Sequence, residues 1–223
     1  MRLYDSLIEK LTTEAQQEQD IIGLLLTGSL ARGDALPGTD IDLRYVLADG
    51  LSRPFERQTH DGILVERGYS DTAAARAGLD MKPMNVYAYL DGRILYDPEG
   101  ALVRLRQDAQ HRFSTYEMAA DDRATIAFLL GCSRDKITVA LGGGDLLKAA
   151  FVTGTSSWQI IEGLWAANGK PVPPNSSVRP HLRDLSRGPY DVENLYSRLF
   201  VAETQVRVQV ALDLIDWIID QLS

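Results

Sequence analysis

The chain has 223 residues, of which 45% are hydrophobic and 24% are charged, and its formal net charge is −8. This length suits one large or two small domains, and the acidic balance argues against a broad nucleic-acid interface, which should be basic. No apolar run reaches the roughly 18 residues that a membrane helix needs. The N-terminal segment lacks the apolar core of a signal peptide, so we expect a cytoplasmic protein.

The first hundred residues carry both helical and strand patterns. Leucines at helical spacing predict a helix over residues 2–18. Continuous or alternating apolar residues predict strands over residues 21–27, 40–47 and 61–70. Asp71 begins a predicted short helix as its N-cap. Two apolar runs joined by Asp91-Gly92 predict a β-hairpin over residues 84–97.

The rest of the chain has only helical periodicity. The predicted helices cover residues 99–113, 117–141, 145–167 and 191–222. The segment LGGGD at residues 141–145 follows a helix and lacks the Lys-Ser/Thr ending of a phosphate loop, so we interpret it as a turn between helices. The sequence therefore predicts an α+β fold, with a mixed-sheet domain over residues 1–110 and an all-α helical bundle over residues 111–223.

Two aspartates on one predicted strand indicate a metal site. Asp40 and Asp42 are two residues apart, so their side chains project from the same face, roughly 7 Å apart along the strand. Two like charges so placed repel each other unless a cation offsets them. Carboxylate oxygens are hard ligands that suit Mg²⁺, which keeps open positions for phosphate oxygens and water.

A glycine-serine turn precedes this pair at the end of the previous predicted strand. Gly28 would allow close approach of a phosphate, and Ser29 offers a hydroxyl and an N–H group. Arg32 adds a fixed positive charge suited to phosphate oxygens. Thr39 could cap the second strand or donate to the same anion. These four residues are the candidate phosphate-binding group.

Glu66 is the candidate third carboxylate. It lies on the predicted strand 61–70 and would join the two aspartates if that strand neighboured residues 40–47. The alternative is an exposed strand glutamate paired with Arg67 or Arg44. Three convergent carboxylates beside a phosphate-binding turn would describe metal-assisted phosphoryl or nucleotidyl transfer.

Together, the segment TGSLARGDALPGTDIDLRYV and the later Glu66 resemble the signature of the DNA polymerase β-like nucleotidyltransferase superfamily. The layout also resembles the kanamycin-type antibiotic nucleotidyltransferases, with a catalytic domain followed by an all-α domain. The resemblance implies a nucleoside triphosphate, with ATP as the expected nucleotide, bound with Mg²⁺ or Mn²⁺ on Asp40, Asp42 and Glu66. It implies attack of a substrate hydroxyl on the α-phosphorus and release of pyrophosphate.

The resemblance also implies a base that removes the hydroxyl proton. Asp135 lies nearest the expected place in the helical half, and Lys136 beside it is a candidate phosphate contact. Asp145 and Glu162 are alternatives for the base, and Lys148 is an alternative for the phosphate contact.

The expected acceptor is a small hydroxylated molecule, with an aminoglycoside-type antibiotic as the leading hypothesis. A cationic acceptor would suit the excess of acidic residues in residues 1–100. We expect neither nucleic acid nor a membrane as a partner, and a homodimer is left open. The alternatives are nucleotidylation of a protein partner and a non-catalytic nucleotide sensor.

Overall fold

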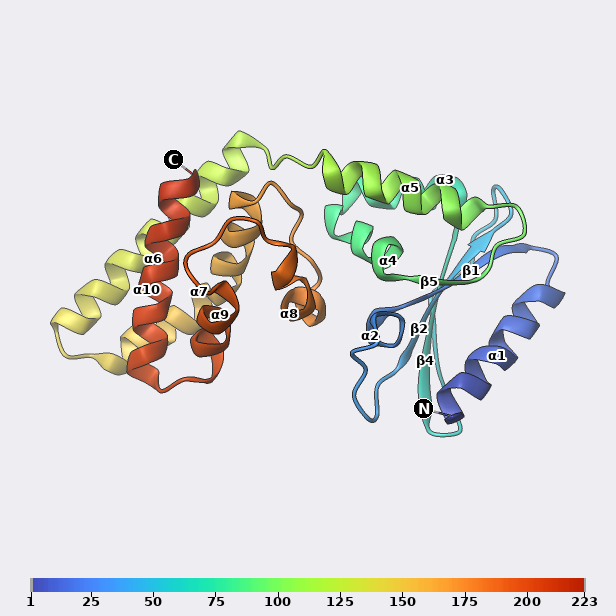
Figure 1. Cartoon of the computed structure of the whole chain (residues 1–223), viewed down its shortest axis with the longest axis horizontal. Coiled ribbons are helices and arrows are strands. Elements are labelled where there is room, and N and C mark those ends of the chain that lie inside the picture. Colours follow the sequence, from blue (N-terminus) through green and yellow to red (C-terminus); the bar gives the residue numbers. More distant parts are fainter. Residues whose placement is uncertain (1, 223) are drawn as a thin grey trace. The chain divides into compact units, whose positions relative to one another are not determined.

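The computed structural model describes residues 2–222 (Figure 1). The chain divides into two compact units, one ending at Thr115 and the other beginning at Tyr116. The fold is α+β: the first unit contains a mixed sheet with helices, and the described part of the second is helical. The expected boundary at residues 110/111 falls inside helix α5 (Ala101–Ser114). Among residues 2–222, no helix combines the length and apolar character needed to cross a membrane.

The sheet of the first unit has five strands in the order β3-β4-β2-β1-β5. Strands β2 and β4 are parallel, and the other neighbouring pairs are antiparallel. The strands are β1 (Ile21–Thr27), β2 (Ile41–Leu47), β3 (Glu56–His60), β4 (Ile63–Asp71) and β5 (Arg93–Tyr96). Strand β1 has the predicted bounds because its apolar run is buried almost throughout.

Each face of the sheet has its own apolar core because side chains alternate along a strand. On one face, Leu24 and Leu26 pack with Leu7 and Leu11 of helix α1 (Arg2–Gln17). On the other face, Leu25 packs with residues of α3 (Thr72–Met81), α4 (Val86–Asp91) and α5. Figure 1 shows α1 apart from α3, α4 and α5. The short helix α2 (Gly28–Arg32) follows β1, and the 3₁₀ turn η1 (Pro83–Asn85) precedes α4.

The start of α3 confirms one sequence prediction. The Asp71 side chain accepts a hydrogen bond from the Ala74 backbone N–H at 2.7 Å, which is the expected N-cap contact. Strand β3 was not predicted because its sequence, ERQTH, has no apolar face. Asp61 and Gly62 connect it to β4 with positive φ values of 49° and 82°, the conformation of a tight hairpin turn.

The predicted hairpin over residues 84–97 is wrong. Residues 86–91 form helix α4, which buries Val86, Tyr87 and Tyr89, and only β5 is a strand, paired with β1. Gly92 has an extended backbone, and a β-carbon there would collide with the Ala88 carbonyl and the Leu25 side chain. This glycine therefore permits close packing of α4 on the sheet and does not form a two-residue turn.

The helices of the second unit pack around an apolar core. This core includes Leu130, Trp165, Leu214 and Ile215, which are all essentially inaccessible to solvent. The turn predicted at residues 141–145 is confirmed, since it joins α6 to α7. The predicted helix 191–222 is two helices, because the chain leaves helical geometry at Ala202. The elements are α6 (Ala120–Gly142), α7 (Leu146–Ala167), η2 (Asn175–Ser177), α8 (Val178–His181), η3 (Leu182–Asp184), α9 (Val192–Val201) and α10 (Thr204–Leu222).

Candidate active site

Three carboxylates converge on the face of the sheet that also carries α3 and α4. In the parallel pairing of β2 with β4, Asp42 lies directly opposite Glu66. Asp40 immediately precedes β2 and shares the face of Asp42. Each residue offers a ligand oxygen within 4.8 Å of the other two, and all three are half-buried. The structure thus brings together the three residues that the sequence singled out.

The environment of Asp42 shows how strongly negative charge is concentrated here. The pKa of the Asp42 carboxyl is raised from 3.8 to about 6, first by burial and then by the neighbouring Asp40 and Glu66 charges. Arg44 and Arg32 act in the opposite direction and lower this pKa. Because burial and like charges outweigh the two arginines in setting this pKa, the protein's own cations do not fully offset the negative charge of the ionised cluster.

The Gly28–Ser29 turn lies against this cluster. Gly28 starts α2 at the end of β1 with a φ of +69°, in the left-handed region that favours glycine. A β-carbon at this position would overlap the Asp42 carboxylate. Thr27, just before it, pairs with Asp42 in the β1–β2 register. Glycine is therefore required both by the backbone conformation and by the space that Asp42 occupies.

Ser29 and Thr39 lie on either side of the loop between α2 and β2. Their hydroxyl oxygens are 2.8 Å apart, which is hydrogen-bonding distance. Tyr4 of α1, which the sequence did not single out, donates a hydrogen bond from its hydroxyl to the Thr39 carbonyl at 2.9 Å. The two predicted phosphate-binding hydroxyls are thus neighbours, and α1 helps to hold the loop that carries Thr39.

Arg32, at the end of α2, lies among acidic groups. Its Nε is 3.2 Å from an Asp34 carboxylate oxygen, and its Nη1 is 4.0 Å from Asp91. The side chain is largely buried, with 11% of its surface exposed. Its charge also lowers the pKa of Asp42, so the guanidinium acts electrostatically on the cluster, and its role as a phosphate contact stays a prediction.

The alternative interpretation paired Glu66 with Arg67 or Arg44, but the structure pairs it with Arg57. Arg57, on the unpredicted strand β3, has its Nε 3.1 Å from Glu66 Oε1. Arg67 pairs with residues on the opposite face of the sheet, and the Arg44 guanidinium lies over the Tyr89 ring at 5.7 Å. No sequence signal identified Arg57, because β3 has neither an apolar pattern nor a motif.

A cavity of about 400 Å³ extends from Asp42 and Glu66 along the same face of the sheet. Small residues of β4 and α3, Gly68, Ala74 and Gly78, leave this space open. The wall also carries polar and aromatic groups, among them Arg44, Phe55, Tyr69, Ser70, Asn85 and Tyr89. The cavity could hold a small molecule with one end at the carboxylates.

The residues predicted from the helical half lie in the second unit. Asp135 and Lys136 are exposed on α6, and the Asp135 carboxylate is 3.6 Å from Arg134 Nε. The Asp145 side chain caps α7 by accepting a hydrogen bond from the Lys148 backbone N–H. Glu162 accepts a hydrogen bond from the Trp158 indole at 2.9 Å. Asp145 and Glu162 therefore have structural contacts, and the roles of Asp135 and Lys136 stay predictions.

The donor set of the first unit fits a hard divalent cation. The three carboxylate oxygens lie within 4.8 Å of one another. This separation is close to the distance of roughly 4 Å between opposite ligands of a bound Mg²⁺. A dication there would offset the repulsion that raises the Asp42 pKa. Asp40, Asp42 and Glu66 are therefore the residues that could hold Mg²⁺ or Mn²⁺.

Residues 8–79 match the model of the nucleotidyltransferase domain family. This range contains the Gly28–Ser29 turn and all three carboxylates, and the match supports transfer of a nucleoside monophosphate as the general activity. The chain is also similar to the crystal structure of a nucleotidyltransferase-like protein from Exiguobacterium sibiricum 255-15. The identity is 14%, the match covers 95% of this chain and 73% of that chain, and the TM-score is 0.45. No curated protein matches the chain.

Proposed function

We propose that this chain is a Mg²⁺- or Mn²⁺-dependent nucleotidyltransferase. It transfers a nucleoside monophosphate, expected to be AMP from ATP, to a hydroxyl group of a small molecule and releases pyrophosphate. The observation that carries the proposal is the convergence of Asp40, Asp42 and Glu66 beside the Gly28–Ser29 turn. The match of residues 8–79 to the nucleotidyltransferase domain supports the same reaction class.

The proposed roles follow from the positions of the side chains. Asp40, Asp42 and Glu66 hold the divalent cation, which when bound stabilises negative charge on the attacking and leaving oxygens. Ser29 and Thr39, whose hydroxyls are 2.8 Å apart, donate hydrogen bonds to the triphosphate. Gly28 leaves room for it, and Arg32 supplies a positive charge for its terminal phosphates.

The reaction balances without a further reactant. The acceptor oxygen forms a bond to the α-phosphorus, the bond between that phosphorus and the bridging oxygen of the β-phosphate breaks, and pyrophosphate leaves. The hydroxyl proton passes to a carboxylate base. Asp135 is our candidate for that base, and Lys136 is our candidate for a further phosphate contact.

The proposed acceptor is an aminoglycoside-type antibiotic or a molecule of similar size with several hydroxyls. The net charge of −8 supports a cationic acceptor, because an acidic protein attracts cationic ligands. The cavity of about 400 Å³ beside the carboxylates is large enough for part of such a molecule.

A pyrophosphate-release screen tests this function. The purified chain is mixed with each of four nucleoside triphosphates, Mg²⁺ or Mn²⁺, and a panel of aminoglycosides and lincosamides. We expect release with at least one acceptor and loss of release in Asp40→Asn. The matched control Asp49→Asn, which removes an exposed acid after β2, should behave as the wild type.

Other outcomes of the screen would overturn parts of the proposal. Release in the Asp40→Asn variant would contradict the metal-dependent mechanism. Nucleotide binding without release for any acceptor would favour a sensor. A mass increase of one nucleotide on a protein in a cell lysate would favour a protein acceptor.

A further inference from the structure

The edge strand β3 presents different residues to the two faces of the sheet. Its register with β4 pairs Arg57 with Glu66 and Glu56 with Arg67. Since successive side chains alternate, Arg57 lies on the face of the carboxylate cluster, whereas Glu56, Gln58 and His60 lie on the opposite face. One short polar strand therefore contributes to two separate polar groups.

On the cluster face, Arg57 forms an ion pair with a candidate metal ligand. Its Nε is 3.1 Å from Glu66 Oε1, and the two residues are directly opposite in the antiparallel β3–β4 ladder. The Arg57 side chain is 62% exposed, whereas the Glu66 side chain is only 27% exposed. The guanidinium thus lies on the solvent side of the cluster and can move into water with little loss of packing.

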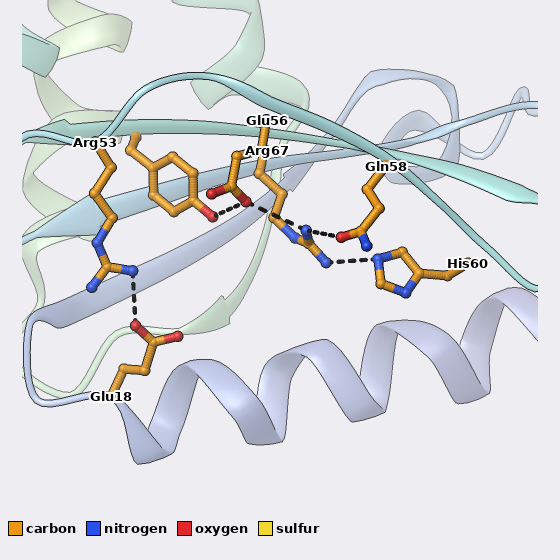
Figure 2. Close-up of polar contacts among 7 residues, drawn as sticks. Glu18, Arg53, Glu56, Gln58, His60 and Arg67 are labelled. Atoms are coloured by element: carbon orange, nitrogen blue, oxygen red, sulfur yellow. Dashed lines mark hydrogen bonds and ion pairs between the residues drawn. The ribbon is translucent and has the colours of Figure 1, made fainter.

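On the opposite face, Arg67 holds three alternate residues of β3 (Figure 2). Only 8% of Arg67 is exposed. Its guanidinium contacts Glu56 at 3.5 Å and donates hydrogen bonds to Gln58 Oε1 at 3.3 Å and to His60 Nε2 at 3.0 Å. A single buried side chain therefore ties most of the length of β3 to β4.

The same strand is linked to the end of α1. The Tyr69 hydroxyl donates a hydrogen bond to Glu56 at 3.0 Å, and the Arg53 guanidinium lies 5.6 Å from the centre of the Tyr69 ring. Arg53 in turn forms an ion pair with Glu18 at 2.8 Å. Figure 2 shows the contact from Arg53 to Glu18 near the end of α1. An edge strand held in this way keeps Arg57 opposite Glu66.

We propose that Arg57 is a displaceable counter-ion of the metal site, held opposite Glu66 by Arg67 on the other face of the sheet. In the metal-free protein Arg57 forms an ion pair with Glu66, and it must release or share that carboxylate when a divalent cation binds. It therefore lowers the affinity of Asp40, Asp42 and Glu66 for the cation. This inference rests on the proposed function, because it assumes that the cluster binds a divalent metal.

The physical reason is competition between two cations for one carboxylate. The ionised carboxylates of the cluster repel one another, and Arg57 offsets part of that repulsion while its side chain stays exposed. A bound dication relieves more of it, but it must overcome both the Arg57–Glu66 attraction and its own repulsion from the guanidinium. Removal of the arginine charge should therefore strengthen metal binding. If Arg57 only oriented Glu66, its removal would weaken metal binding instead.

The test is calorimetric titration of the nucleotide-free, full-length protein with Mn²⁺. We expect Arg57→Gln to bind Mn²⁺ about fivefold more tightly than the wild type, the scale of one exposed ion pair. Arg57→Lys, which keeps the charge, should stay within about twofold. The matched control Arg93→Gln removes an exposed arginine from the other edge strand, β5, and should leave the affinity unchanged.

The possible results separate this inference from the proposed function. Equal or weaker Mn²⁺ binding by Arg57→Gln, with pyrophosphate release intact in the wild type, would overturn the inference alone. Absence of Mn²⁺ binding in both proteins would overturn the inference and the metal site together.

A double-mutant cycle tests the positioning role of Arg67. We expect Arg67→Met to tighten Mn²⁺ binding in the wild-type background and to have no further effect in the Arg57→Gln background. A direct electrostatic effect of the lost Arg67 charge would appear equally in both backgrounds and would contradict the positioning role. Glu56→Gln removes one Arg67 contact while preserving side-chain shape, and it replaces Arg67→Met in the cycle if that variant does not fold.

Discussion

Asp42 of β2 and Glu66 of β4 lie directly opposite each other, although strand β3 intervenes between β2 and β4 in the chain. The parallel pairing places both carboxylates on one face, beside Asp40 and the Gly28–Ser29 turn. The pKa of the Asp42 carboxyl is raised, mainly by burial. Asp42 therefore lies at the centre of the candidate site, and its ionised carboxylate destabilises the folded protein.

Asp42→Asn should abolish nucleotidyl transfer and leave the fold intact. The substitution removes one candidate ligand while preserving the side-chain shape, so we expect activity to fall by about a thousandfold or more. The thermal midpoint of the metal-free variant should equal or exceed that of the wild type, because a buried, repelled charge is lost. Pyrophosphate release and thermal unfolding measure the two effects. Retained turnover in a folded variant would contradict the mechanism.

The stability of the metal-free protein should depend on pH through Asp42. Its pKa is about 6 in the folded protein and 3.8 in the unfolded reference, so the folded state binds more protons between these values. Stability from this group is therefore present at low pH and is lost as pH rises from about 4 to about 6. We expect the urea midpoint of the wild type, measured with EDTA, to fall across this window relative to Asp42→Asn. Parallel curves for the two proteins would refute the shift.

The same carboxyl should make metal binding sensitive to acid. A divalent cation needs the ionised form of Asp42, whose pKa is about 6 in the metal-free protein. Below that pH, the apparent Mn²⁺ affinity should drop by up to about tenfold per pH unit as protons compete for this group. Calorimetric titrations at about pH 5, 6 and 7 measure the dependence. An affinity that stays constant down to pH 5 would show that Asp42 is not a ligand.

Gly28→Ala and Gly50→Ala form a matched pair that separates backbone strain from damage to the site. Both glycines have positive φ values, of +69° and +77°, so either alanine should cost about 1–2 kcal/mol of stability. Only the Gly28 β-carbon would overlap the Asp42 carboxylate, whereas the space around Gly50 is open. We therefore expect loss of activity in Gly28→Ala alone. Equal activities at matched fractions folded would contradict the close approach.

Two glycines of α7 offer a corresponding test of packing in the second unit. A β-carbon at Gly163 would lie 2.6 Å from Ile218 Cγ2 of α10, so Gly163→Ala should destabilise by about 1–3 kcal/mol. Gly154 is exposed and has open space, so Gly154→Ala should stabilise the helix by about 0.5–1 kcal/mol. Denaturant unfolding of both variants measures the difference. A neutral Gly163→Ala would indicate a looser contact between α7 and α10.

Features that depend on short stretches of sequence were predicted well. The bounds of β1 follow from its seven-residue apolar run, and the start of α3 follows from Asp71, whose carboxylate accepts a backbone hydrogen bond three residues later. Asp40 and Asp42 share a face because side chains alternate along a strand. In each case the cause lies within a few residues, so the chain's own pattern is sufficient.

Contacts between distant segments were predicted poorly. The apolar run before Asp91-Gly92 suggested a strand, but packing of Tyr87 and Tyr89 in the core stabilises a helix instead. Strand β3 has no apolar face, and it forms because pairing with β4 and contacts to Arg67 satisfy its backbone and polar side chains. Local propensity was overridden by tertiary interactions in both segments.

The sequence by itself determined the glycine-serine turn, the paired aspartates and their likeness to a nucleotidyl-transfer motif, since these lie within fifteen consecutive residues. It also named Glu66, but only on the condition that its strand neighboured β2. The tertiary structure decided that condition through the parallel β2–β4 pairing, and it added Arg57 to the cluster from an unpredicted edge strand. The physical reason is that strand pairing joins residues far apart in the chain, and its register depends on the packing of the whole sheet.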